Sequence, residues 1–243
     1  MKAIILAAGR GSRMGDMTAD QPKCLTKLKG IALLDRQLAA LREGGVDEIG
    51  IVTGYRREAL ADRGLHEFHN ADWSHTNMVS SLACARRWLQ DGPCIVSYSD
   101  IFYEAQAVRS LIHYDGALAL TYDPDWLSLW GARFSDPLSD AETFRLAPDG
   151  TLLEIGEKPL TVGEVQGQYM GLLRFTPESW HALDNMRAAL PRDERNQMHM
   201  TGALQHLIRT GGIAIHAVPY SGTWGEVDSQ EDLAVYESAP LRP

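Results

Sequence analysis

Short apolar runs alternate with helical patterns over the first half of the chain. Residues 2–8 form a continuous apolar run that ends at a glycine, which is typical of a strand buried in a parallel sheet. Residues 32–44 carry leucines at helical spacing before a Gly-Gly stop. Further strand patterns cover 46–53 and 94–99, and a second helical pattern covers 78–90. This order of strands and helices predicts a parallel α/β sheet.

After residue 115 the pattern becomes mixed. Short strand-like runs are separated by turn residues such as those at 148–150, and helical patterns return near the C-terminus. The predicted strands cover 116–122, 142–146, 151–155, 168–175, 213–218 and 223–227, and the predicted helices cover 177–187, 200–210 and 229–237. Because no repeat or linker interrupts the sequence, we predict one domain over 1–243, with a parallel half at 1–115 and a mixed half at 116–243.

Composition and charge exclude several classes of protein. The chain has 243 residues and a net charge of −9, which disfavours binding to a nucleic-acid backbone. Three cysteines without a CxxC pair argue against a disulfide framework or a zinc knuckle and favour a reducing cytoplasm. No stretch approaches the roughly 20 apolar residues that span a membrane. We therefore expect no nucleic-acid or membrane partner.

A glycine-rich loop that carries its own cations follows the first strand. The stretch Ala7–Met14 reads AAGRGSRM, and Met14 occupies the position where a dinucleotide-binding fingerprint requires glycine. The remaining features are two arginines, Arg10 and Arg13, and Lys23 shortly after them. Small residues let the backbone approach a phosphate, and fixed cations stabilise the charge that develops when a triphosphate is attacked. A plain strand-to-helix turn with solvated arginines is the alternative.

Carboxylates lie at positions that suit a magnesium ion. Asp100 ends the predicted strand 94–99, and ligands bind beyond such strand ends in parallel sheets. Glu226 and Asp228 alternate along a predicted strand, so both face one side. Mg²⁺ takes one or two carboxylates, so this pair offers a second ligand beside Asp100. The alternatives are that Asp100 opens a turn or caps a helix and that Asp228 caps the last helix.

The string LAAGxGxR followed by PK resembles the signature of the nucleotidyltransferase superfamily. This resemblance implies an α/β, Rossmann-like fold with a central mixed, mostly parallel sheet flanked by helices. It assigns nucleotide binding to the half at 1–115 and acceptor binding to the half at 116–243. Lys23 and Arg13 are the implied catalytic residues. The resemblance also implies a second metal ligand in the string WGEVD at 224–228, where we predict Asp228, with Glu226 next. The implied nucleotide-binding residues are Leu6, Ala7, Ala8, Gly9, Gly11, Ser12, Arg13, Lys23, Asn77 and Ser81.

Residues 75–82, HTNMVSSL, resemble the cytidylyltransferases that activate phosphocholine, aminoethylphosphonate or phosphoglutamine. The resemblance implies CTP as donor, Mg²⁺ (with Mn²⁺ as a substitute), and a small phosphate- or phosphonate-bearing acceptor. It also admits a homodimer. A sugar-1-phosphate nucleotidylyltransferase that uses UTP or dTTP, and a non-catalytic nucleotide-binding regulator, are the alternatives. Thr76 or Asn77 can also be read simply as a helix cap.

Candidate acceptor residues lie in the mixed half. In the superfamily a lysine after a strand often holds the acceptor phosphate, and Lys158 has that position. Aromatic rings can attract a quaternary ammonium, whereas carboxylates pair with a primary amine. The acidic residues there favour an amine slightly over choline, and core packing is the alternative for each aromatic. The candidates are Lys158, Trp130, Tyr169, Asp140 and Tyr122.

Overall fold

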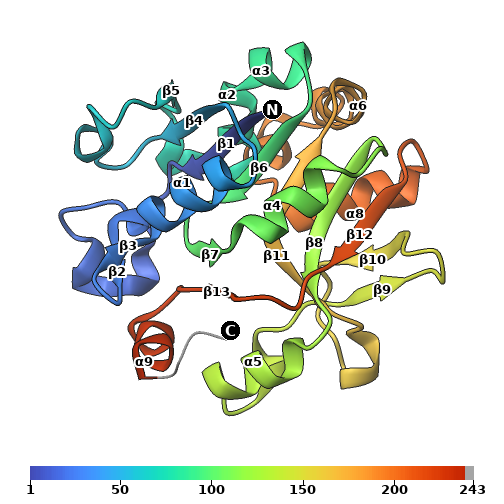
Figure 1. Cartoon of the computed structure of the whole chain (residues 1–243). Helices are drawn as coiled ribbons and strands as arrows, with labels where there is room; N and C mark the ends of the chain where they lie inside the picture. Colours follow the sequence, from blue (N-terminus) through green and yellow to red (C-terminus); the bar gives the residue numbers. More distant parts are fainter. Residues whose placement is uncertain (239–243) are drawn as a thin grey trace.

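A seven-stranded sheet forms the centre of the computed structural model, which describes residues 1–238 (Figure 1). Its strands, in spatial order, are β12 (Ile215–Pro219), β8 (Leu118–Asp123), β11 (Gln168–Phe175), β6 (Cys94–Tyr98), β1 (Lys2–Ala7), β4 (Glu48–Thr53) and β5 (His66–His69). The helices are α1 (Leu33–Glu43), α2 (Met78–Cys84), α3 (Arg86–Asp91), α4 (Ala105–Ile112), α5 (Trp126–Arg133), α6 (Pro177–Ala188), α7 (Arg192–Asn196), α8 (Met200–Thr210) and α9 (Gln230–Ser238).

The sheet is mixed, and one strand accounts for its antiparallel pairs. Strands β6, β1, β4 and β5 run parallel, as do β12 and β8. Strand β11 lies between β6 and β8 and pairs with both in the antiparallel sense. The predicted central, mostly parallel sheet flanked by helices is therefore confirmed.

Alternate residues of β1 point into two different cores. Ala3, Ile5 and Ala7 pack with α1 and α4 on one face of the sheet. Ile4 and Leu6 pack with α2, α3, α6 and α8 on the other face. A strand covered on both faces must be apolar at every position, which explains the uninterrupted apolar run at its start.

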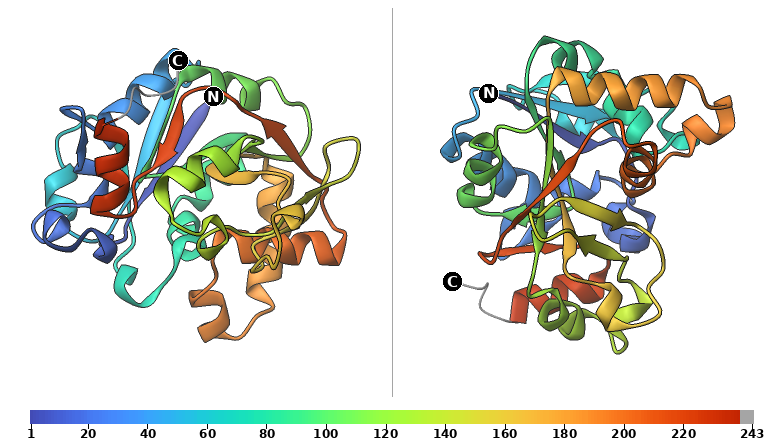
Figure 2. Two further views of the ribbon diagram at one scale, coloured as in Figure 1. Left: turned by 90° about the horizontal axis from the view of Figure 1, so that it is seen from below. Right: turned by 90° about the vertical axis from the view of Figure 1, so that its right-hand side faces the viewer.

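Three two-stranded ladders complete the fold: β2 (Lys27–Leu28) with β3 (Ile31–Ala32), β7 (Ile101–Tyr103) with β13 (Trp224–Glu226), and β9 (Phe144–Leu146) with β10 (Leu152–Ile155). The β7–β13 ladder brings the C-terminal segment back to the end of β6, and helix α9 then packs beside α5 (Figure 2). Within residues 1–238 no helix is both long and apolar enough to cross a membrane.

The predicted strands and helices all have counterparts in the structure, although the one helix predicted at 78–90 is divided into α2 and α3. The elements that were not predicted include β5, α4 and α5. Strand β5 has the sequence HEFH and is a polar edge strand, so it lacks an apolar run. Only Glu104 separates the end of β7 from the start of α4, so no turn signal in the sequence marks where the helix begins. Helix α5 contains two tryptophans and a glycine, which obscure a helical pattern.

Candidate active site

The glycine-rich loop lies between β1 and a short 3₁₀ segment, Ser12–Thr18. Gly11 has a left-handed backbone with φ of 68°, and a Cβ there would lie 2.8 Å from both Cβ and Cδ of Lys23. Glycine is therefore required by the backbone conformation and by the side chain that passes beside it. The buried Thr18 hydroxyl donates to Gly11 O at 3.1 Å and holds the loop in this shape.

Lys23 connects this loop to two carboxylates. Its Nζ donates to Asp100 Oδ2 at 2.8 Å and to Asp228 Oδ1, and its side chain is 8% exposed. Burial alone would lower the pKa of Lys23, but Asp100 and Asp228 outweigh burial and raise that pKa. Arg13 Nη2 reaches Asp228 Oδ2 at 2.9 Å, while most of its side chain remains exposed. The site thus holds one buried and one exposed cation, and both pair with Asp228.

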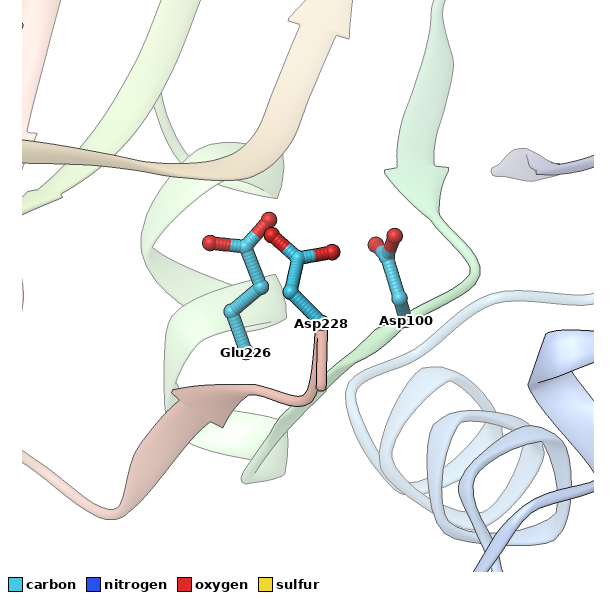
Figure 3. Close-up of side chains that lie close together, drawn as sticks. All are labelled: Asp100, Glu226 and Asp228. Atoms are coloured by element: carbon cyan, nitrogen blue, oxygen red, sulfur yellow. The ribbon is translucent and has the colours of Figure 1, made fainter. Parts of the chain in front are cut away.

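Three carboxylates converge at this point (Figure 3). Asp100 follows β6, whereas Glu226 ends β13 and Asp228 lies two residues further on. Oxygens of Asp100, Glu226 and Asp228 all lie within 4.8 Å of one another. The β7–β13 ladder creates this convergence, because Glu226 pairs with Ile101 and Val227 N donates to Asp100 O at 2.9 Å.

The carboxylate cluster suits a divalent cation. Burial, followed by the charges of Asp228 and Asp100, raises the pKa of Glu226 well above its usual range. Asp100 Oδ1 is buried and has no hydrogen-bond partner among residues 1–238. A buried carboxylate oxygen without a donor is costly unless a cation binds it, and Mg²⁺ prefers such hard oxygen ligands.

A first cavity of about 290 Å³ extends from the glycine-rich loop along the start of α2. The predicted nucleotide-binding residues line it except Ala7, which is buried beneath. Asn77 has two roles here, because it lines the cavity and its Oδ1 accepts from Met78 N at 2.7 Å to cap α2. Trp73, Thr76 and Tyr98 also line it. The sequence did not predict Trp73 as a nucleotide-binding residue, because it belongs to no recognisable motif.

A second cavity of about 290 Å³ adjoins the first, and both are lined by Arg13, Met78, Tyr98 and Asp100. Three predicted acceptor residues line it, namely Trp130, Asp140 and Tyr169. Trp130 is nearly buried, and its Nε1 donates to Asp140 Oδ2 at 3.2 Å. Glu142 also lines this cavity, and burial raises the pKa of its carboxyl group. Thr201 Oγ1 donates to Glu142 Oε1 at 3.4 Å.

The lining of these two cavities, as the described residues form it, includes neither Lys158 nor Tyr122. Lys158 Nζ donates to the carbonyl oxygens of Leu138 and Ser139, the latter at 2.6 Å, and stays near the surface. The Tyr122 ring stacks on Phe144 with centroids 5.0 Å apart. Their roles in acceptor binding stay a prediction, and neither side chain reaches the cavities in this conformation.

The buried side chain of Arg133 contacts Glu226 directly and the backbone of Asp228 through Asp232. Its Nε donates to Asp232 Oδ1 at 2.7 Å, and its Nη1 lies 3.7 Å from Glu226 Oε2. Asp232 Oδ2 in turn accepts from Asp228 N at 2.9 Å and from Ser229 N at 3.0 Å. Ser229 Oγ accepts from Asp232 N, so Ser229, not Asp228, caps the last helix. Asp228 is consequently free to face the site.

Comparison with known proteins places the chain in a family. Residues 3–161 match the family model described as a MobA-like NTP transferase domain. This chain belongs to that nucleotidyltransferase family. It is 36% identical to the CTP:phosphoglutamine cytidylyltransferase of Campylobacter jejuni, over 97% of this chain and 98% of the relative. It is 25% identical to the 2-aminoethylphosphonate cytidylyltransferase of Lancefieldella rimae, over 97% and 91% of the two chains.

Solved structures agree on the fold. The inositol-1-phosphate CTP transferase from T. maritima superposes with a TM-score of 0.75, at 20% identity, over 97% of this chain and 93% of the other. The predicted resemblance to nucleotidyltransferases of the cytidylyl branch and the Rossmann-like fold are confirmed.

Proposed function

We propose that this chain transfers CMP from CTP to a small phosphate or phosphonate acceptor that carries a nitrogen-containing group. The main support is that two adjoining cavities meet at one cluster of charged side chains. One cavity is lined by the glycine-rich loop and suits a nucleotide, and the other is bounded by carboxylates and aromatic rings. The cytidylyltransferase names of the two relatives support CTP and an acceptor with a nitrogen atom.

The reaction follows from this arrangement. An oxygen of the acceptor phosphate or phosphonate attacks the α-phosphorus of CTP, a new P–O bond forms, and the bond to the β-phosphate oxygen breaks. Pyrophosphate leaves with the electron pair. In this proposal Lys23 and Arg13, which lie beside Asp100 and Asp228, stabilise the negative charge on the α-phosphate and on the leaving group. Neither acid–base exchange nor a covalent enzyme intermediate is required.

The same cluster supports Mg²⁺ as cofactor, with Mn²⁺ as a substitute. Asp100, Asp228 and Glu226 would hold the ion, and we keep Asp228 ahead of Glu226 as the second ligand. When bound, the ion would neutralise phosphate charge and orient the triphosphate. Without it, Lys23 already balances part of the carboxylate charge.

The decisive experiment incubates the enzyme with each of CTP, UTP, dTTP, ATP and GTP and a panel of acceptors, and measures released pyrophosphate. The panel contains phosphocholine, aminoethylphosphonate, phosphoethanolamine, phosphoglutamine and glucose 1-phosphate. Turnover with CTP and a nitrogen-bearing acceptor, abolished by EDTA and restored by Mg²⁺ or Mn²⁺, is expected. Turnover confined to UTP or dTTP with the sugar phosphate would establish a sugar nucleotidylyltransferase instead. Binding of nucleotide without turnover of any acceptor would favour a regulator.

A cytoplasmic location and a homodimer are further parts of this proposal. Cell fractionation tests the first, and sedimentation of the purified chain tests the second.

A further inference from the structure

The lining of the first cavity has a charged part and an uncharged part. Lys23, Arg13 and Asp100 belong to the charged part, in which the two cations are the counter-charges for a triphosphate. Trp73, Thr76 and Ser81 belong to the uncharged part. A nucleobase needs a flat apolar contact and hydrogen bonds, and these three side chains offer both. The base of the nucleotide therefore belongs beside Thr76 and Ser81.

Asn70 holds the hydroxyl groups of Thr76 and Ser81 in place by hydrogen bonds. It follows β5, is 5% exposed, and its Nδ2 donates to Thr76 Oγ1 at 3.0 Å and to Ser81 Oγ at 3.0 Å. The orientation of the Asn70 side-chain amide is fixed, because its Oδ1 accepts from Asp72 N at 3.1 Å and its Nδ2 must therefore point the other way. Both hydrogens of the amide are thus used, one on each hydroxyl oxygen.

These contacts give the two hydroxyl groups different hydrogen-bonding capacities. Thr76 Oγ1 accepts from Asn70 and donates its single hydrogen to Asp72 O at 2.9 Å. Only a lone pair remains, so Thr76 can accept from a ligand but cannot donate to it. Ser81 Oγ also accepts from Asn70 but keeps its hydrogen, so it can donate to a ligand.

We infer that Asn70, through Thr76 and Ser81, selects cytosine over uracil. Cytosine presents an amino donor at position 4 beside a ring-nitrogen acceptor at position 3, whereas uracil presents an acceptor and a donor at those positions. Thr76 accepts from the 4-amino group and Ser81 donates to the ring nitrogen. When uracil occupies the site, the free lone pair of Thr76 Oγ1 faces the lone pairs of the 4-oxygen, and the two oxygens repel each other. Thr76 is a specificity-determining residue and Asn70 a positioning residue, and this inference rests on the proposed function.

The test combines variants with an analogue of CTP that lacks only the 4-amino group, pyrimidin-2-one riboside triphosphate. The wild-type kcat/KM for CTP should exceed that for the analogue by at least about tenfold, since the site leaves a polar group unpaired with the analogue. In Thr76→Val, which keeps the shape but removes the acceptor, the ratio should fall to within about threefold of unity. Thr76→Ser keeps a hydroxyl group and should retain the wild-type ratio.

Asn70→Ala should lower the ratio of kcat/KM for CTP to that for the analogue by raising the KM for CTP. The reason is that the hydroxyl groups of Thr76 and Ser81 are then no longer oriented by the amide. A merely structural role would lower the efficiency with CTP and with the analogue equally. The inhibition constant of inorganic tripolyphosphate, which contacts only the charged part, should stay unchanged in each folded variant. If Thr76→Val cannot be purified folded, Thr76→Ala provides the same comparison.

A Thr76→Val or Thr76→Ala enzyme that keeps the full preference for CTP over the analogue would overturn the inference. A wild-type enzyme that prefers UTP, dTTP or a purine nucleotide would instead refute the proposed function. The two failures are distinguishable because the second is visible before any variant is made.

Discussion

At the scale of single residues, Lys23 forms ion pairs with two carboxylates of the site. Its ammonium lies between carboxylates from the middle and from the end of the chain, and Gly11 leaves the space through which its side chain passes. Asp100 and Asp228 raise its pKa despite burial, which favours its cationic form.

We predict that Lys23→Ala lowers kcat by at least about a hundredfold, because it removes a charge directed at the transition state. Steady-state pyrophosphate release measures the rate, and thermal unfolding in saturating Mg²⁺ checks that the fold remains. Lys27→Ala is the matched control, since Lys27 lies in the same segment but is exposed. Near-normal turnover in Lys23→Ala would contradict the assignment of Lys23.

The three carboxylates make a separate prediction about the metal. Asp100→Asn and Asp228→Asn should each raise the Mg²⁺ concentration for half-maximal activity by about tenfold or more and lower the maximal rate. Asp20→Asn, which alters a solvent-exposed carboxylate, is the control. A wild-type response in Asp228→Asn, together with an inactive Glu226→Gln, would show that the order of these two ligands is reversed.

At the scale of elements, the pair Arg133 and Asp232 joins α5 to α9 and holds the segment that carries Asp228. Both side chains are buried, and the same carboxylate that binds Arg133 also accepts from the backbone of Asp228 and Ser229. The position of the segment 226–228 therefore depends on α9, which itself contributes no residue to the lining of either cavity.

Asp232→Ala should lower the free energy of unfolding by about 3 kcal/mol, because it leaves a buried guanidinium without its partner. For a chain of this size the melting temperature should fall by roughly 6–12 °C. Calorimetry measures the change, and Glu231→Ala, an exposed neighbour in the same helical turn, is the control. A melting temperature equal to that of Glu231→Ala would mean that the pair does not stabilise the fold.

The same variant has a predictable pH dependence. Burial would raise the pKa of Asp232, but the hydrogen bond and charge of Arg133 lower it below its usual value. A lowered carboxyl pKa adds stability that is present above the unfolded-state pKa of about 4 and is lost as pH falls through the folded-state value. The stability difference between wild type and Asp232→Ala should therefore shrink below about pH 4.

At the scale of the whole molecule, both halves of the chain share one sheet. Strand β6 from the half at 1–115 pairs with β11 from the half at 116–243, and the second cavity is lined by residues of both halves. The prediction of one domain leads to an expected single cooperative unfolding transition, with equal calorimetric and van't Hoff enthalpies. Two separate transitions would indicate two domains.

Acceptor choice also depends on the whole molecule, because the second cavity combines residues from both halves. Its carboxylates favour a primary amine over a trimethylated nitrogen, which cannot donate hydrogen bonds. We expect kcat/KM for aminoethylphosphonate to exceed that for phosphocholine by about tenfold. Asp140→Asn should reduce this ratio, whereas Trp130→Phe, which preserves the buried ring contact, should not. Loss of phosphocholine use confined to Trp130→Ala, which removes the ring, would instead favour an aromatic cage.

Local chemistry allowed the sequence to predict the central strands and the glycine-rich loop. A strand with two covered faces must be apolar throughout, as 3–8 is, and a loop that approaches phosphate needs small residues beside its cations. These requirements act within a few residues, so the sequence displays them directly. It likewise showed that Asp100 ends a buried strand and that Glu226 and Asp228 alternate.

Only the tertiary structure decided which of these residues meet. The β7–β13 ladder joins Asp100 to Glu226 and Asp228, and a pairing between segments so far apart in the chain leaves no local signal in a single sequence. For the same reason the sequence did not reveal Asn70, whose amide matters only because Thr76 and Ser81 fold around it. Hydrogen-bond direction depends on every partner that an atom has, and those partners are brought together only by folding.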